Sequence, residues 1–319
     1  MASSERPHLI IGICTFRRPE MLRRCLASVL AQECPEGWKV EIVVVDNDAQ
    51  SDLAEMISRA FRDPKYPIRY FIEPRRGIPH ARNAVCRHAL SVKADLIAFI
   101  DDDEEADPGW LMAYARGVAT YEAQAYTGPV RYIFPPGYED WLANKGFAET
   151  KHGALLKRAA TANVMFRTSV LGPEGESLQF DTNMALTGGS DTDFFMRLVH
   201  QGGRIVYLSD AVASEAVVPN RLTIRWRLKR QYRSSANRVY IESKLFGAKK
   251  TARRAVKELV RHGVEGTLRL VFSPVMLLGG YRKFKRSWYH GLRHFAKAGG
   301  IIAGLRARQV QPYRQTDGY

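Results

Sequence analysis

Four short apolar segments alternate with amphipathic segments over the first hundred residues, and this alternation restricts the chain to few folds. The apolar segments are HLIIGICTF, EIVVVDND, IRYFIEP and DLIAFIDDD. Runs of consecutive apolar, mostly β-branched residues are typical of strands buried on both faces. Such strands joined through helices predict an α/β fold with a mostly parallel, Rossmann-like sheet and flanking helices.

The segments between and after these strands carry helical spacing. The helix that begins at Pro19 has its apolar residues on one face: Leu22, Cys25, Leu26, Val29 and Leu30. A second helix is expected from about Pro79 to Val92. Mixed strands and loops follow from residue 124 to 170, then a short helix in SDTDFFMRLVHQ. RIVYLSDAVASEAV is expected to form one last strand.

Polar residues follow three of the predicted strands. CTFRR ends the first, DND the second and DDDEE the fourth. In open parallel sheets, ligands bind outside the carboxyl ends of the strands. These polar ends are therefore expected to form a site along one edge of the sheet.

The charge is divided unevenly. From Arg227 onward the chain has 22 Lys and Arg against 4 Asp and Glu, a net +18, whereas the first 226 residues have 26 against 29. This division predicts a neutral or acidic catalytic domain, residues 1–225, and a basic, mostly helical C-terminal region, residues 226–319. The basic region is expected to contact nucleic acid or anionic lipid headgroups.

Cysteine spacing and the first residues indicate the compartment. The four cysteines form no CxxC pair, so we expect them to be reduced and three of them to be buried: Cys14, Cys25, Cys34 and Cys86. MASSERPHLI contains no apolar leader segment, which predicts a cytoplasmic protein.

The acidic run from Asp101 to Glu105 has two interpretations. It forms a solvated turn in which Asp103 or Asp107 caps the next helix, or a cation lies among its oxygens. Two carboxylates one residue apart suit a hard divalent cation that shares its ligands with phosphates. At the end of a parallel strand, the second interpretation predicts Mg²⁺ or Mn²⁺ joining Asp101 and Asp103 to a diphosphate.

Two further stretches contain candidate donor-binding residues. Asp46 and Asn47 offer hydrogen-bond partners for a base or ribose, or they form an Asx turn. In RRGIPHARN, Gly77 permits close backbone approach, and Arg76 and Arg82 supply donors for phosphate, unless the stretch is an ordinary basic loop.

GGSDTDFF places an acidic residue at a helix N-terminus after two glycines. Ser190 or Asp191 caps the helix, or Asp191 faces the reacting centre as a general base.

In this order, the motifs resemble those of family 2 glycosyltransferases with the GT-A fold, over about residues 8–225. The motifs are CTFRRPEMLRRCLASVLAQ, EIVVVDND, GIPHARN, IAFIDDDEEADPGWL and GGSDTDFFMRL. The forms GIPHARN and GGSDTDFFMRL are most similar to the ExoM-like branch of bacterial exopolysaccharide glycosyltransferases. The resemblance implies an inverting transfer of a sugar from a nucleotide diphosphate donor, with UDP-glucose or a related UDP-sugar expected, to a saccharide acceptor, polyprenyl-diphosphate-linked or other.

The resemblance also implies roles at matched positions. The nucleotide base would lie against Thr15, Phe16, Arg17 and Asp46, and Arg82 would help to hold the donor. Asp101, Asp102 and Asp103 would form the metal and diphosphate site, and Asp191 would be the base. Many relatives have a histidine after the last strand, whereas this chain has Glu215, a possible metal ligand. Residues 128–171 would set sugar specificity, with Trp141 as one candidate contact.

The basic C-terminal region has two interpretations as well. It packs as helices with a solvated basic face, or it anchors the protein peripherally at the inner face of the cell membrane. TLRLVFSPVMLLGGYRKFKRSWYHGLRHFAKAGGIIAGL contains two apolar runs, each shorter than the roughly 20 residues that span a bilayer. Beside Lys, Arg, Trp and Tyr, both runs are expected to lie in an anionic leaflet.

Two other classes of function fit parts of the pattern. A metal-dependent nucleotidyltransferase acting on nucleic acid would use the aspartates for two metals and the basic tail for the phosphate backbone. The separation of basic residues from the carboxylates argues against that class, so no nucleic-acid partner is expected. A non-catalytic nucleotide-sugar-binding protein would not need Asp101, Asp103 and Asp191 together.

Overall fold

The computed structural model describes residues 6–138, 150–172 and 178–306, and Trp141 lies outside them. The described residues form two compact units. One contains residues 6–133, 150–172 and 178–216, and the other contains residues 134–138 and 217–306.

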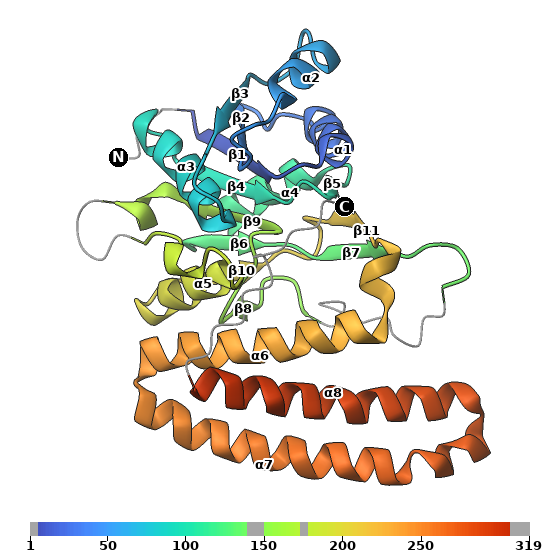
Figure 1. Ribbon diagram of the computed structural model, residues 1–319. Coiled ribbons are helices and arrows are strands. Elements are labelled where there is room, and N and C mark those ends of the chain that lie inside the picture. Colours follow the sequence, from blue (N-terminus) through green and yellow to red (C-terminus); the bar gives the residue numbers. More distant parts are fainter. Residues whose placement is uncertain (1–5, 139–149, 173–177, 307–319) are drawn as a thin grey trace. The chain divides into compact units, whose positions relative to one another are not determined.

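The first unit is built on an eight-stranded sheet (Figure 1). The strand order is β3-β2-β1-β4-β9-β6-β10-β8, and β3, β2, β1 and β4 are parallel. β9 and β8 run antiparallel to their neighbours, whereas β10 is parallel to β6. The strands are β1 (His8–Thr15), β2 (Lys39–Asp46), β3 (Ile68–Ile72), β4 (Leu96–Ile100), β6 (Ala125–Thr127), β8 (Leu155–Leu156), β9 (Asn163–Arg167) and β10 (Ile205–Tyr207).

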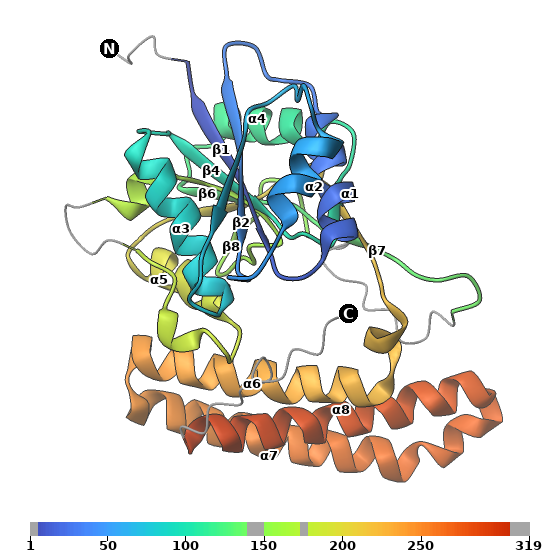
Figure 2. The ribbon, with the colours of Figure 1, turned by 45° about the horizontal axis from the view of Figure 1, so that its top comes forward.

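Helices cover both faces of this sheet (Figure 2). Alternate residues of β1 point to opposite faces, so Leu9, Ile11 and Ile13 join one apolar cluster and Ile10 joins the other. The first cluster contains residues of α1 (Pro19–Leu30), α2 (Leu53–Ala60) and α4 (Trp110–Thr120), and the second those of α3 (Ile78–Ser91) and α5 (Ser190–His200). The predicted mostly parallel α/β sheet with flanking helices is confirmed.

A second sheet of three strands has the order β5-β11-β7. It contains β5 (Glu104–Ala106), β7 (Val130–Ile133) and β11 (Ala213–Ala216). The prediction of a single last strand in RIVYLSDAVASEAV is wrong, because β10 and β11 belong to different sheets. The chain turns between them, where the Ala211 N–H donates to Leu208 O at 3.3 Å. Short 3-10 helices occupy η2 (Thr168–Leu171), η3 (Thr182–Met184) and η4 (Pro219–Leu222).

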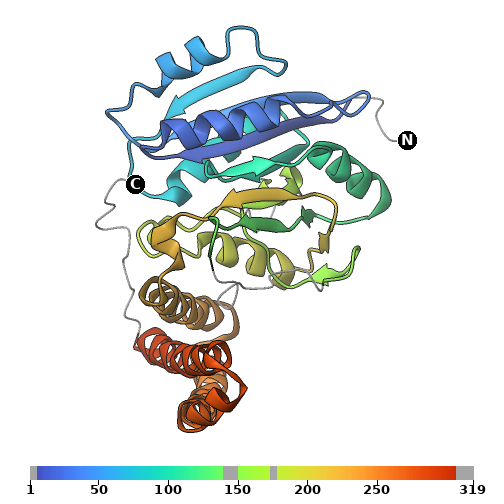
Figure 3. The ribbon, with the colours of Figure 1, turned by 90° about the vertical axis from the view of Figure 1, so that its right-hand side faces the viewer.

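The second unit consists mainly of three long helices (Figure 3). These are α6 (Ile224–Phe246), α7 (Ala248–Phe272) and α8 (Tyr281–Leu305), with the 3-10 helix η5 (Pro274–Gly279) between α7 and α8. α8 packs against both α6 and α7 (Figure 1). Among the described helices, none has both the length and the apolar character needed to cross a membrane.

The second apolar run of the C-terminal region, GGIIAGL, was expected to lie in a leaflet. Its residues are divided between the interior and the surface of the helical unit. Ile301 and Ala303 are buried, whereas Ile302 and Leu305 are exposed. Ile301 forms a small apolar cluster with Val239 of α6 and Ala255 of α7. As expected, three cysteines are buried and Cys34 is exposed, and all four are free.

Candidate active site

The carboxyl ends of β1 and β4 are joined by side-chain hydrogen bonds. The Thr15 hydroxyl donates to Asp102 Oδ2 at 2.7 Å. The Arg18 guanidinium donates to Asp102 Oδ1 at 3.0 Å and to Asp103 Oδ2 at 3.3 Å. Asp102 is buried and both of its oxygens are engaged. Its side chain therefore fixes the strand end, and burial raises its pKa to about 6 despite the neighbouring Arg18.

Asp101 stands at the first position after β4 and has a different environment. Its side chain keeps 41% of its exposure, and the Arg82 guanidinium lies 3.8 Å from its Oδ1. Its pKa is raised to about 7, first by the loss of solvation and then by the charges of Asp103, Asp102 and Asp191, against the lowering effect of Arg82. The site thus has an excess of negative charge that Arg18 and Arg82 only partly offset.

Two glutamates add to this negative charge. Glu104 of β5 is directly opposite Glu215 of β11 in the antiparallel pairing of the small sheet. Glu104 is 2% exposed, and its Oε2 has no hydrogen-bond partner in the described structure. Burial raises its pKa well above the ordinary value, and the charges of Asp101, Asp103 and Glu215 raise it further. A buried carboxylate with an unpaired oxygen is costly unless it is protonated or faces a cation.

This set of oxygens fits a hard divalent cation. Mg²⁺ and Mn²⁺ prefer carboxylate, phosphate and water oxygens, and Mg²⁺ commonly binds one or two carboxylates together with substrate phosphates. Among the described residues, no three carboxylates of this site have oxygens within 4.8 Å of one another. In the described residues, the one group of three ligand side chains whose atoms lie within 4.8 Å of one another is His262, Glu265 and His294, in the helical unit.

The end of β2 is organised by internal hydrogen bonds. Asp46 is fully buried and accepts from the Asp48 N–H and the Tyr70 hydroxyl, each at 3.0 Å. The Asn47 amide donates to the carbonyl oxygens of Glu73 and Arg75, both at 2.8 Å.

The same amide of Asn47 also accepts, at 2.7 Å, from the N–H of Gly77. All of its hydrogen-bonding atoms thus hold residues 73–77, the loop before α3. Gly77 has φ 128°, which disfavours other residues, and a Cβ there would lie 2.5 Å from the Cβ of Ala185. The backbone approach predicted for Gly77 is therefore to Ala185 in this structure, and Asn47 acts as a support for the loop.

Phe16 lies beside two arginines at the edge of the site. The guanidinium carbon of Arg17 is 5.0 Å from the centre of the Phe16 ring, and that of Arg76 is 5.7 Å away. Arg17 has φ 56° and donates through Nε to Asp48 Oδ2 at 2.6 Å. This arrangement presents an aromatic face and two cations beside the ends of β1 and β2.

Arg82 connects the two sides of the site. It is buried on α3, its Cζ is 5.7 Å from the centre of the Phe180 ring, and its Nη1 donates to Ser190 Oγ at 3.2 Å. The guanidinium therefore reaches both Asp101 and the first residue of α5.

Asp191 lies in the first turn of α5. The N-cap is Gly189, with φ 88° and no side-chain cap, so neither Ser190 nor Asp191 caps this helix as the alternative interpretation required. Asp191 Oδ1 accepts from the Thr192 N–H at 2.7 Å. Its Oδ2 has no hydrogen-bond partner among the described residues. Because the charge of Asp191 contributes to the raised pKa of Asp101, the two carboxylates belong to one electrostatic site.

Sequence reasoning missed three residues of this site and also Asn163, which pairs with Ile100 at the end of β4. Arg18, Glu104 and Ser190 stood inside quoted motifs, but their partners come from distant segments. Asn163 had no motif at all. Its side chain accepts from Trp110 Nε1 and the Tyr114 hydroxyl at 2.8 Å, and it donates to the carbonyl oxygens of Pro129 and Ala211.

Comparison with known sequences gives one family. Residues 10–172 match glycosyl transferase family 2. The succinoglycan biosynthesis protein ExoM of Rhizobium meliloti is 31% identical over 234 residues, which cover 72% of this chain and 74% of that protein. A glucosyl-dolichyl phosphate glucuronosyltransferase of Haloferax volcanii is 25% identical over 247 residues, 70% of this chain and 73% of that one.

A solved structure gives the same fold. The mannosyltransferase PcManGT from Pyrobaculum calidifontis, in complex with GDP-Man and Mn²⁺, aligns with a TM-score of 0.62 and 18% identity. The alignment covers 95% of this chain and 88% of that chain.

Proposed function

Because the chain belongs to glycosyl transferase family 2, we propose that it transfers a sugar from a nucleotide diphosphate donor to a saccharide acceptor in cell-surface polysaccharide synthesis. The observation that carries the proposal is that the Arg82 guanidinium lies beside Asp101 and donates to Ser190, the residue before Asp191. An anionic donor, a cation and a proton acceptor are the components that such a transfer requires.

The nucleotide is assigned to the ends of β1 and β2. The base lies against Phe16, flanked by Arg17 and Arg76, whose positive charges also suit the phosphates. Thr15 and Asp46 fix the positions of these strand ends, since their side chains are already hydrogen-bonded within the protein. The donor is proposed to be UDP-glucose or a related UDP-sugar, on the resemblance of the motifs to ExoM-like sequences.

The diphosphate is assigned to the acidic edge. Asp101, Asp103 and Glu215 would hold Mg²⁺ or Mn²⁺. Asp102 fixes the end of β4, and Glu104, opposite Glu215 in the small sheet, would add negative charge. When bound, the cation supplies positive charge to the leaving diphosphate. The PcManGT structure, which contains Mn²⁺ and GDP-Man, supports this assignment for a protein of the same fold.

The remaining step is a proton transfer. Asp191 accepts the proton of the acceptor hydroxyl through Oδ2, and Thr192 fixes the orientation of the carboxylate by donating to Oδ1. Arg82 stabilises negative charge that develops on the diphosphate. Attack from the face opposite the leaving group inverts the anomeric configuration.

The acceptor is proposed to be a lipid-linked saccharide, polyprenyl-diphosphate-linked or similar. The Haloferax volcanii relative, whose name specifies a glucosyl-dolichyl phosphate, supports a lipid-linked acceptor for this chain as well. Such an acceptor would place the protein peripherally at the cytoplasmic face of the membrane, with the basic helical region at the lipid surface.

A transfer assay tests the proposal. The protein is incubated with UDP-[¹⁴C]glucose, Mn²⁺ and a lipid extract from exopolysaccharide-producing bacteria, and the organic phase is counted. We expect label in the lipid fraction with the wild type and none with Asp101→Asn. Absence of both transfer and UDP release, with every nucleotide sugar and lipid extract tried, would refute the proposed function.

A further inference from the structure

Exposed apolar residues are concentrated in one part of the second unit. Of the 22 large apolar side chains that are exposed in the described residues, 11 lie between residues 256 and 281. Leu278 in η5 is 92% exposed. A soluble protein rarely leaves a continuous patch of this kind uncovered, so this part of the surface is expected to have a partner.

α7 has two distinct faces. Its buried residues, Thr251, Ala255, His262 and Gly266, follow helical spacing and form the inner face. The opposite face, here called the α7 outer face, consists of Lys249, Arg253, Val256, Val260, Val264, Leu268 and Val271. Steps of three and four residues align these side chains over about 33 Å of helix. The first two turns of this face are cationic and the rest is aliphatic.

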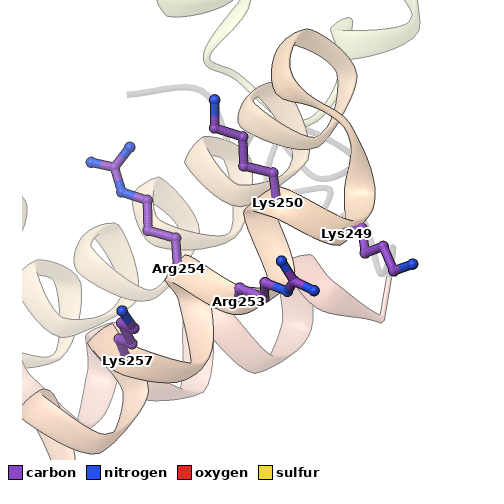
Figure 4. Close-up of a pocket in the computed structure, with 5 residues that line it drawn as sticks. All are labelled: Lys249, Lys250, Arg253, Arg254 and Lys257. Carbon is purple, nitrogen blue, oxygen red and sulfur yellow. The ribbon is translucent and has the colours of Figure 1, made fainter.

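The cationic end forms an open pocket of about 560 Å³ (Figure 4). Its lining residues are all basic: Lys249, Lys250, Arg253, Arg254 and Lys257. Arg254 Nε lies 3.5 Å from Glu258 Oε1, so part of this charge is already paired. The pocket is large enough for a phosphate-bearing headgroup, and the chemistry of its lining selects anions.

The aliphatic end continues into η5. Val275, Met276, Leu277 and Leu278 are exposed there, followed by Tyr281 at the start of α8. Directly after them come Arg282, Lys283, Lys285 and Arg286, and then Trp288. Apolar side chains between two groups of cations, with Tyr and Trp at the boundary, are typical of segments that lie in the interface of an anionic bilayer.

We propose that the α7 outer face and η5 form the surface that docks on an anionic lipid bilayer. Lys249, Lys250 and Arg253 contact headgroup phosphates, the valines lie at the boundary with the acyl chains, and η5 enters most deeply. The docking surface deepens the proposed function in one respect, because a lipid-linked acceptor requires the enzyme to work at a membrane.

Charge complementarity favours a bilayer over a second copy of the chain. The residues from Arg227 onward have 22 basic side chains against 4 acidic ones. Two such surfaces facing each other would repel, whereas an anionic leaflet attracts them. The geometry also refines the sequence interpretation, since the most exposed apolar residues come from α7 and η5, with Tyr281 and Trp288 of α8 beside them.

Vesicle flotation of the full-length protein tests the docking surface, without donor or acceptor present. Vesicles of phosphatidylcholine with phosphatidylglycerol are compared with vesicles of phosphatidylcholine alone. The triple variant Lys249→Gln, Lys250→Gln, Arg253→Gln should reduce partitioning on the order of a hundredfold, because each charge contributes about fivefold. Its matched control removes three exposed charges of the other unit: Lys151→Gln, Lys157→Gln and Arg158→Gln.

A second pair of variants tests the apolar part. Val260→Glu with Val264→Glu replaces side chains that are 61% and 54% exposed. Leu155→Glu with Ile133→Glu, at 60% and 54% exposure, is the control. The α7 variant should lose at least about tenfold in partitioning. The control pair should bind as the wild type does.

Four results would overturn the proposal. These are equal binding to neutral and anionic vesicles, no binding to either, equal losses in the α7 and control variants, and a dimer that the α7 substitutions dissociate. The last result would assign the surface to a second copy. Calorimetric donor titration of the same variants, without vesicles, separates this proposal from the catalytic one, because the docking variants should bind donor as the wild type does.

Discussion

Replacing Asp191 with asparagine isolates the proton transfer from the other parts of the site. Asparagine has the same shape, and its oxygen can still accept from the Thr192 N–H, which donates to Asp191 at 2.7 Å. The fold should therefore be unaffected, with the free energy of unfolding changed by less than about 0.5 kcal/mol. What disappears is the proton acceptor at Oδ2.

The expected loss follows from the contribution of a positioned base. General base catalysis contributes about 10²- to 10⁴-fold, so kcat of Asp191→Asn should fall by that factor, or about 2.7–5.5 kcal/mol. Donor affinity should change by less than about threefold, because Asp191 meets the acceptor and not the nucleotide. Removing its negative charge also relieves Asp101, whose pKa the charge of Asp191 helps to raise.

The assay is UDP release from the donor with acceptor present, combined with calorimetric donor binding and thermal unfolding. Asp193→Asn in the same helix is the control. Asp193 is fully buried and paired with Arg197 at 2.8 Å, so this change should lower the melting temperature while keeping most of the turnover. Wild-type kcat in Asp191→Asn would refute the assignment of the base. A parallel loss of folding and turnover would also refute it, because it would show a structural role.

Three other changes have defined outcomes. Asn47→Ala should weaken donor binding, measured by calorimetry, by about tenfold, since it removes the three hydrogen bonds that hold residues 73–77. Unchanged affinity would show that this loop does not contribute to the donor site. Glu104→Gln should weaken Mn²⁺ binding severalfold in titrations with UDP, because a carboxylate beside Glu215 is replaced by an amide; unchanged Mn²⁺ affinity would remove Glu104 from the cation site. Burial lowers the pKa of His290 to about 4, so the fold keeps it neutral while the unfolded chain takes up a proton near pH 6.5. Stability, measured as the melting temperature, should therefore fall as pH drops from about 6.5 towards 4, and it should fall less in His290→Gln. An equal fall in His290→Gln would assign the effect to other groups.

The sequence was most informative where each residue's role depends on its neighbours in the chain. Consecutive apolar residues from Leu96 to Ile100 predicted a buried strand, and the aspartates after it had to emerge at the carboxyl edge of the sheet. The same reasoning located Asp46 and Thr15, because β1, β2 and β4 are adjacent and parallel. Because these strands are adjacent and end at the same edge of the sheet, the candidate residues lie close to one another.

Roles that depend on distant partners could not be predicted in this way. Asp101 and Asp102 are neighbours, yet Thr15 and Arg18 engage both oxygens of the buried Asp102, whereas the side chain of Asp101 is 41% exposed. Nothing local to Asn47 indicated that its amide would hold residues 73–77. These outcomes are decided by competition for hydrogen bonds in the folded chain, which the spacing of residues does not record.

Long-range packing also decided the wrong prediction of one last strand, and the partial burial of the second apolar run. RIVYLSDAVASEAV has strand character throughout, and only its partners, β6 for one half and β5 and β7 for the other, divide it between two sheets. In the helical unit, the apolar run containing Ile301 looked suitable for a membrane. Ile301 is buried because α8 packs against both α6 and α7, while Ile302, Leu305 and the apolar residues of the α7 outer face remain exposed.

The most direct test of the central claim, a metal-assisted nucleotide-sugar site at Asp101 and Asp103, is calorimetric titration of donors into the purified protein. UDP-glucose, UDP-galactose and GDP-mannose are titrated with Mn²⁺ and again with EDTA, into the wild type and into Asp101→Asn. We predict micromolar binding of UDP-sugars that requires Mn²⁺ and is lost in Asp101→Asn. Binding of equal strength in EDTA, or no binding of any of the three donors, would contradict the account.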